Sequence, residues 1–158
     1  MKILIFSDSH GRMENIRDVL IRSGKVDMVI HLGDIERQED TLENMCECPV
    51  IIVRGNCDFA SDKDVLRTMT LGNHKAFITH GHHYSVKYGL ERIYFAAREQ
   101  ECDIVMFGHT HVPMIQYDEG ITYINPGSIE LPVAGYKPSY ILMEMDSEGE
   151  AHFTLNYL

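Results

Sequence analysis

The sequence predicts an α/β fold in which parallel strands come first and antiparallel strands come last. Through the first third of the chain, short apolar runs of β-branched residues alternate with segments whose apolar residues recur at helical spacing. In the last third, strand-like runs follow one another around short polar turns, which is typical of antiparallel structure. At 158 residues the chain is long enough to bury a core, and we expect residues 1–158 to form a single domain.

The first third has the order β-α-β-α-β. Apolar runs predict buried strands over 2–6, 28–32 and 50–54. Between them, residues at helical spacing predict helices over about 13–23 and 39–45. Because crossover helices join parallel strands, this order favours a parallel sheet covered by helices.

The rest of the chain combines one helix with further strands. We expect a hairpin of strands 65–71 and 75–79, followed by a helix over about 88–100 with one apolar face. The final expected strands cover 104–107, 114–117, 121–125, 139–145 and 152–157. Residues 126–138, rich in proline and glycine, are the longest irregular stretch and a candidate site wall or interface.

The composition excludes several classes of partner. The formal net charge of −10 provides no basic face, so we expect no binding to duplex nucleic acid. No apolar run approaches the roughly 20 residues that span a bilayer, so we expect no membrane partner. The first apolar run is too short for a signal peptide, and the four cysteines include no Cys-x-x-Cys pair, so we expect a cytoplasmic protein with reduced thiols.

Five short polar motifs each follow an apolar run. They are Asp8-Ser9-His10, Gly33-Asp34, Gly55-Asn56, Thr79-His80-Gly81-His82 and Gly108-His109-Thr110-His111. Because ligands bind beyond the carboxyl ends of strands in open α/β sheets, we expect these motifs to meet at one edge. Glycine before a ligand allows a sharp turn or a positive φ. Two carboxylates, one amide oxygen and at least four imidazoles indicate a two-metal hydrolytic site that activates water against a phosphate ester.

The ordered set of motifs resembles that of the calcineurin-like metallophosphoesterases, and specifically the small bacterial and archaeal phosphodiesterases. The resemblance runs from about Lys2 to Ser128 and includes the turn Asn125-Pro126-Gly127-Ser128. It implies a four-layer α/β sandwich, with two mixed β-sheets packed face to face and helices outside. It also implies hydrolysis of small phosphate esters or diesters through two metal ions.

The resemblance assigns ligands by motif position. Asp8, His10 and His111 would hold the first metal, and Asn56, His80 and His109 the second. Asp34 would bridge both, so that a bridging hydroxide attacks phosphorus in line. Asp34 and Asn56 thereby count as catalytic residues. Manganese is the expected cation, with nickel, zinc, iron and magnesium as alternatives.

One position departs from the family pattern. Many members have histidine after Gly-Asn, where it helps to protonate the leaving group, whereas this chain has Cys57. A thiol is a poor acid near neutral pH, which indicates weaker catalysis or a preference for good leaving groups. His82, or else His83, is the alternative proton donor, and His82 is our candidate catalytic residue.

Other polar residues near the motifs have plainer interpretations. His31 is expected to be a core histidine rather than a ligand. Asp58 is expected to form hydrogen bonds within its own turn, and Arg54 to form a structural ion pair.

A second functional hypothesis is a non-catalytic protein-interaction scaffold on the same fold. The complete set of ligands argues against it, because two crowded carboxylates repel each other without a metal. A homodimer is a further expectation, with 126–138 and the terminal strands as candidate interface regions.

Overall fold

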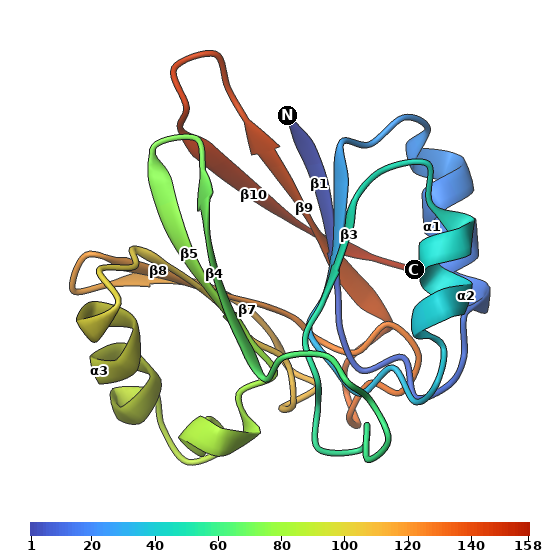
Figure 1. Cartoon of the computed structure of the whole chain (residues 1–158), viewed down its shortest axis with the longest axis horizontal. Coiled ribbons are helices and arrows are strands. Elements are labelled where there is room, and N and C mark those ends of the chain that lie inside the picture. Colours follow the sequence, from blue (N-terminus) through green and yellow to red (C-terminus); the bar gives the residue numbers. More distant parts are fainter.

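The computed structural model describes residues 1–158 and contains two five-stranded sheets that face each other (Figure 1). The first sheet has the order β10-β9-β1-β2-β3. Its strands are β1 (Lys2–Phe6), β2 (Met28–His31), β3 (Val50–Ile52), β9 (Ser139–Met145) and β10 (Ala151–Tyr157). β1, β2 and β3 are parallel, as the β-α-β-α-β order predicts, whereas β9 runs antiparallel to β1.

The second sheet has the order β4-β5-β6-β8-β7. Its strands are β4 (Leu66–Leu71), β5 (His74–Thr79), β6 (Ile104–Met106), β7 (Pro113–Asp118) and β8 (Ile121–Pro126). β5, β6 and β8 are parallel, and the edge strands β4 and β7 are antiparallel to their neighbours. Both sheets are therefore mixed.

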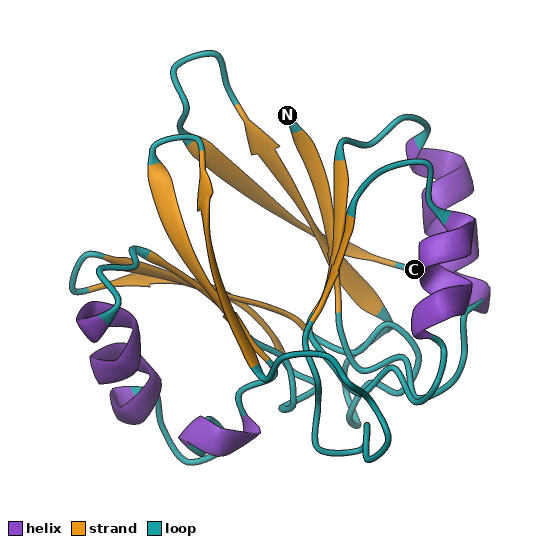
Figure 2. Ribbon diagram, viewed as in Figure 1, coloured by secondary structure: helices purple, strands orange, loops and turns teal.

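Helices cover the outer faces of both sheets (Figure 2). α1 (Glu14–Ser23) and α2 (Glu39–Met45) lie outside the first sheet, and α3 (Glu91–Glu99) lies outside the second. A short 3₁₀ turn, η1 (His82–Tyr84), was not expected from the sequence. The order helix, sheet, sheet, helix confirms the predicted four-layer sandwich. No helix is long and apolar enough to cross a membrane.

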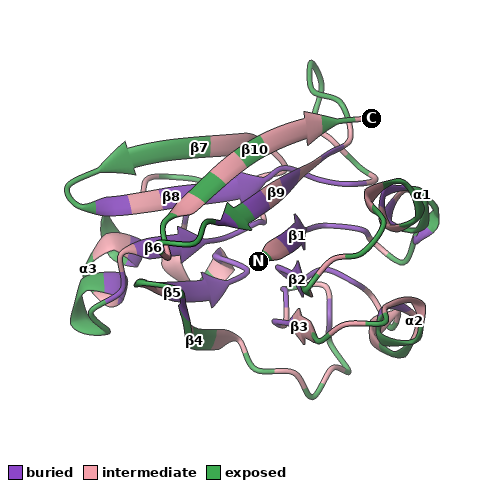
Figure 3. Ribbon diagram, turned by 90° about the horizontal axis from the view of Figure 1, so that it is seen from above, coloured by how far each residue is buried: buried purple, intermediate pink, exposed green.

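Alternation along β1 explains how one strand contributes to two apolar layers. Ile3 and Ile5 pack between the two sheets, whereas Leu4 and Phe6 pack with residues of α1 and α2. All four side chains are buried because β1 is central in its sheet and covered on both faces. Figure 3 shows the same contrast across the molecule, since the edge strands β7 and β10 are far more exposed than β1.

Several predicted elements differ from the observed ones at their ends. β2 and β3 stop at His31 and Ile52, before the turns that carry the ligand motifs. α3 begins at Glu91 rather than near residue 88, because Tyr88 is exposed and Gly89 has a φ of +152°. The last four strands form two antiparallel hairpins as predicted, but each hairpin belongs to a different sheet.

The layer between the sheets predicts a stability difference between two isoleucines. Ile5→Ala should lower the free energy of unfolding by about 3 kcal/mol, because it leaves a cavity between the sheets. Ile21→Ala should change it by less than about 0.5 kcal/mol, because Ile21 is 73% exposed on α1. Urea denaturation of both variants checks this difference, and equal losses would contradict the assignment of Ile5 to the inter-sheet layer.

Candidate metal centre

The polar motifs meet at one end of the two sheets, where β1, β2, β3, β5 and β6 all end. In Figure 1 this end lies at the bottom. The first sheet contributes four of the predicted ligands and the second contributes three. In chain order they are Asp8, His10, Asp34, Asn56, His80, His109 and His111.

One half of the cluster contains Asp8, His10 and His111. Their ligand atoms all lie within 4.8 Å of one another. His111 Nε2 is 3.1 Å from Asp8 Oδ1 and 3.3 Å from His10 Nε2. These are the three residues that the resemblance assigns to the first metal.

The other half is centred on His80. Its Nε2 lies 3.1 Å from Asn56 Oδ1 and 3.4 Å from Asp34 Oδ2. The ring centroid of His109 lies 5.1 Å from the ring centroid of His80. The two halves adjoin, because Asp8 Oδ1 is also 3.9 Å from His80 Nε2.

Three imidazoles are oriented by hydrogen bonds at Nδ1. His80 Nδ1 donates to the Leu32 carbonyl at 2.7 Å, and His111 Nδ1 donates to the Leu131 carbonyl at 2.6 Å. His10 Nδ1 lies 2.7 Å from the Glu36 carboxylate. With the proton held at Nδ1, each ring can present an Nε2 lone pair to the cluster, which is the usual arrangement of metal-binding histidine.

Asp8 has one satisfied and one unsatisfied oxygen. Its Oδ2 accepts hydrogen bonds from the Ser7 hydroxyl and from the His109 backbone N–H. Its Oδ1 is buried and accepts no well-formed hydrogen bond, although it faces His111 Nε2 at 3.1 Å and His80 Nε2 at 3.9 Å. A buried carboxylate oxygen without a donor is costly unless a cation binds it, so this atom fits a metal ligand.

The charges of the cluster stabilise one another. Burial alone would raise the pKa of Asp8 and Asp34, but nearby histidines outweigh it and lower both, His80 acting on both residues and His111 on Asp8. Burial opposes protonation of His80, but Asp34 and Asp8 outweigh it and raise its pKa. The carboxylates are therefore ionised, and a bound cation would replace the imidazolium protons as their counter-charge.

Comparison with known proteins identifies the family. The calcineurin-like phosphoesterase superfamily domain matches residues 1–148. The chain belongs to the calcineurin-like phosphoesterase superfamily. It is 39% identical over 152 residues to the probable metallophosphoesterase YsnB of Bacillus subtilis, covering 94% of this chain and 86% of YsnB.

Other relatives agree with this assignment. The chain is 30% identical over 171 residues to the phosphodiesterase YfcE of Escherichia coli K12, covering 92% of this chain and 89% of YfcE. The crystal structure of a predicted phosphoesterase from Streptococcus pneumoniae TIGR4 superposes with a TM-score of 0.82 at 32% identity, covering 99% of this chain and 88% of that one. The resemblance read from the five motifs is thus confirmed.

Backbone strain is concentrated at the family motifs. Five of the seven predicted ligands have left-handed backbone conformations, with φ between 47° and 66°. These residues are Asp8, His10, Asp34, His109 and His111. Such conformations disfavour side chains that have a Cβ, and they persist at functional sites where the surrounding structure imposes them.

The glycines of two motifs allow the ligand loops to touch. Gly33 has a φ of +96°, and a Cβ built there would lie 2.7 Å from the Gly55 backbone nitrogen. A Cβ on Gly55 would collide with Asp34, although the φ of Gly55 is not positive. Gly55 is therefore required for close approach rather than for the positive φ that we had allowed for it.

Asp58 connects these two loops, which the sequence did not reveal. Its carboxylate accepts the backbone N–H groups of Asp34 at 2.8 Å, Gly55 at 2.7 Å and Glu36 at 2.7 Å. The predicted bond within its own turn exists, but two of the three donors belong to the Asp34 loop. Asp58 thus fixes both Asp34 and the turn before Asn56, and it also positions Glu36, the partner of His10.

Of the two remaining sequence interpretations, the one for His31 is confirmed and the one for Arg54 is wrong. His31 is a buried core histidine as predicted: Gly33 N–H donates to its Nδ1 at 3.2 Å, its Nε2 lies 3.1 Å from Ser9 Oγ, and burial lowers its pKa to about 4. The ion pair predicted for Arg54 is wrong, because its guanidinium instead donates to the Ser61 carbonyl at 3.5 Å. A peptide carbonyl thus takes the place of the expected carboxylate.

The candidate proton donor lies beside the second half of the cluster. The ring of His82 is 5.4 Å from that of His80 and 6.1 Å from that of His109, measured between centroids. Burial, followed by the charge of His80, lowers the pKa of His82 to about 4. His83 is exposed at the surface.

The position of Asp58 predicts a defect in metal binding. Asp58→Ala should weaken metal binding by about 10- to 100-fold, because the loops of Asp34 and Asn56 lose their common acceptor. Asp58→Asn, which keeps the shape of the side chain, should weaken it less. Titration of metal into stripped protein measures the affinity, with Asp64→Ala on the same loop as control. Native metal affinity in both Asp58 variants would show that the hydrogen bonds of Asp58 are not needed for metal binding.

Proposed function

We propose that the chain hydrolyses small phosphate esters, and diesters in particular, with two divalent cations. The observation that carries this proposal is the buried Asp8 Oδ1, which faces imidazole Nε2 atoms and accepts no well-formed hydrogen bond, in a cluster where three histidines have their Nδ1 atoms engaged. Relatives named as metallophosphoesterase and phosphodiesterase support the same reaction class.

The proposed ligand sets follow the two halves of the cluster. The first cation is held by Asp8, His10 and His111. The second is held by Asn56, His80 and His109, with Asp34 shared between the two. When bound, such a pair of cations lowers the pKa of an attacking water and neutralises charge that develops on the phosphoryl oxygens. The mixture of carboxylate, amide and imidazole ligands suits manganese, with nickel, zinc, iron or magnesium as alternatives.

His82 is proposed to assist the departure of the leaving group. It follows the ligand His80 by two residues, and its Nδ1 is buried without a hydrogen-bond partner. Cys57, at the position where many members have histidine, has a pKa raised to about 12 by burial and by Asp34. A thiol with that pKa is too weak an acid to protonate a leaving group, so we assign the role to His82. Because the pKa of His82 is about 4, its ring is neutral near pH 7 and assists the leaving oxygen through an N–H hydrogen bond.

The proposed setting is cytoplasmic, with a small-molecule substrate and neither duplex nucleic acid nor membrane as a partner. The net charge of −10 supports the exclusion of nucleic acid. A homodimer remains part of the proposal. The alternative, a non-catalytic interaction scaffold, requires that the cluster no longer turns over any ester.

Metal addition to stripped protein tests the proposed reaction. Bis(p-nitrophenyl) phosphate should be hydrolysed only after a divalent cation is added, with manganese compared against nickel, zinc and magnesium. Asp34→Asn should lower the rate by at least about 100-fold and reduce bound metal at both positions, because one carboxylate serves two cations. Metal binding without any turnover would favour the scaffold, and normal turnover in Asp34→Asn would refute the bridging ligand.

The proton donor can be tested with two classes of leaving group. His82→Ala should slow esters of poor leaving groups, such as alkyl alcohols, by about 100-fold or more, and should barely affect nitrophenyl esters. His83→Ala serves as the neighbouring control. Equal effects of His82→Ala on both classes would assign the residue to binding or structure instead of proton transfer.

A further inference from the structure

A cavity of about 810 Å³ adjoins the candidate metal centre. Its walls are the segments 36–40, at the start of α2, and 57–63, after β3. Its volume falls in the usual range of small-molecule pockets. Two of its lining residues, Glu36 and Cys57, belong to the loops that carry Asp34 and Asn56, so the cavity offers space for a group attached to a phosphate held at the metals.

Two residues of the cavity wall, Glu36 and Cys57, also lie beside the candidate metal centre. The Cys57 thiol, the Glu36 carboxylate and the His10 imidazole lie within 4.8 Å of one another. The Cys57 backbone N–H also donates to Asp34 Oδ1 at 2.8 Å. A substituent that passes Cys57 therefore enters the cavity directly from the metal centre.

The charge of the cavity differs in sign from that of a loaded metal centre. Five carboxylates and two cationic side chains line it. Asp58 is occupied by three backbone N–H groups, and Glu36 is occupied by His10. The lining cation Lys63 pairs with Glu43, which lies outside the wall, at 2.9 Å. The second lining cation, Arg37, forms no ion pair. Three other carboxylates also form none and therefore outnumber it; they are Glu39, Asp40 and Asp62.

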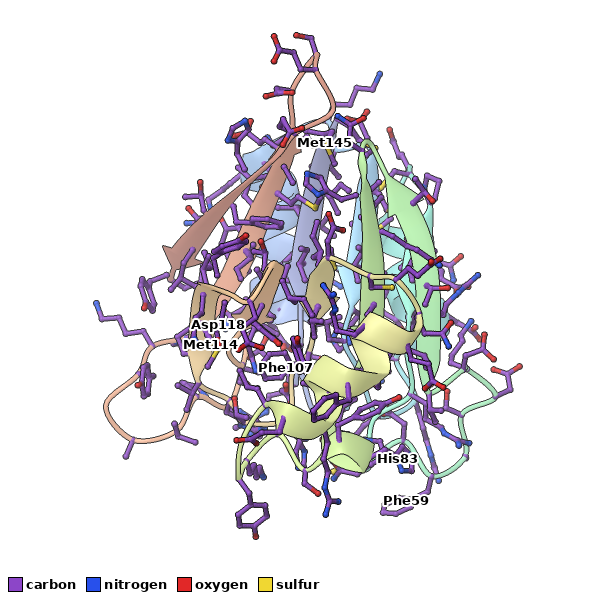
Figure 4. All side chains as sticks on the ribbon, turned by 90° about the vertical axis from the view of Figure 1, so that its left-hand side faces the viewer. Phe59, His83, Phe107, Met114, Asp118 and Met145 are labelled. Atoms are coloured by element: carbon purple, nitrogen blue, oxygen red, sulfur yellow. The ribbon has the colours of Figure 1, made fainter.

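An aromatic side chain stands at the rim of the cavity. Phe59 belongs to the wall and leaves 92% of its surface exposed. Figure 4 places Phe59 at the same end of the molecule as His83, opposite Met145. An aromatic face beside carboxylates is a recurrent means of binding an ammonium group, which both charge and the ring quadrupole attract.

We propose that this cavity binds the organic substituent of the substrate and selects phosphodiesters of amino alcohols. The phosphate lies at the metals, and the ammonium group of the ester lies between Phe59 and the carboxylates of Glu39, Asp40 and Asp62. This proposal rests on the proposed phosphodiesterase activity and adds the substrate class. Anionic substituents are disfavoured by the same carboxylates.

Three esters with one common leaving group separate charge from reactivity. They are p-nitrophenyl phosphorylcholine, its carbon isostere p-nitrophenyl 3,3-dimethylbutyl phosphate, and p-nitrophenyl 2-carboxyethyl phosphate. The substituent of the isostere is uncharged, and this compound is called the uncharged ester below. Because each ester releases p-nitrophenolate, differences in kcat/KM measured with the manganese-loaded protein reflect the other substituent alone. We expect kcat/KM for the choline ester to exceed that of the isostere by about tenfold, with the carboxylate slowest.

Matched variants connect this preference to the cavity. The triple variant Glu39→Gln, Asp40→Asn, Asp62→Asn should abolish the choline preference and leave the rate for the uncharged ester unchanged. A control with the same change in net charge, Asp18→Asn, Glu99→Gln, Asp118→Asn, should keep the preference. Phe59→Ala should reduce it about threefold without altering a charged residue.

Each outcome has a distinct meaning. Equal kcat/KM for the choline ester and its isostere would overturn the proposal, as would a preference that survives the cavity variant. If no ester is hydrolysed with any metal, the proposed phosphodiesterase activity itself has failed. Hydrolysis of the uncharged ester without a choline preference shows that the activity stands and that the substrate class is wrong.

Discussion

Two buried carboxylates, Asp8 and Asp34, are the constraint on which the rest of the site depends. Both lie at the end of the parallel strands with almost no exposure, where an isolated anion would be expensive. Their neighbours supply compensation in the form of histidines and backbone N–H groups. Two adjacent anions favour a cation between them, and this charge requirement supports the proposal of a divalent metal at the cluster.

The strain in the ligand loops follows from the same requirement. Short strands such as β2 and β3 end abruptly, and the next residues must turn their side chains toward one point. Left-handed conformations at the ligands accomplish this within one or two residues. The hydrogen bonds of Asp58 and the close approach of Gly33 to Gly55 maintain these conformations. Stability and ligand geometry are therefore set by the same contacts.

Much of the architecture was predictable because it is encoded locally. Apolar runs such as Lys2–Phe6 mark the strands, and the five motifs follow them at once. The pairing of the last two hairpins with different sheets was not predictable, since it depends on contacts distant in sequence. Asp58 and Glu36 were likewise missed as supports of the site, because their partners are backbone groups and an imidazole nitrogen that become neighbours only on folding. The sequence also predicted a sharp turn or positive φ for the glycines before the ligands, but only Gly33 of Gly33, Gly55 and Gly108 adopts a positive φ, whereas five of the predicted ligands do.

The division of the ligands between two sheets gives the apolar interior a geometric function. Asp8, Asp34 and Asn56 extend from the first sheet, and His80 and His109 from the second. The isoleucine- and methionine-rich layer between the sheets therefore acts as a spacer, and its thickness sets how far apart the two groups of ligands stand. A substitution in that layer would change coordination without touching a ligand. Because each half of the cluster takes residues from both sheets, the packing of the core is a mechanical determinant of the distances among the predicted ligands within each half.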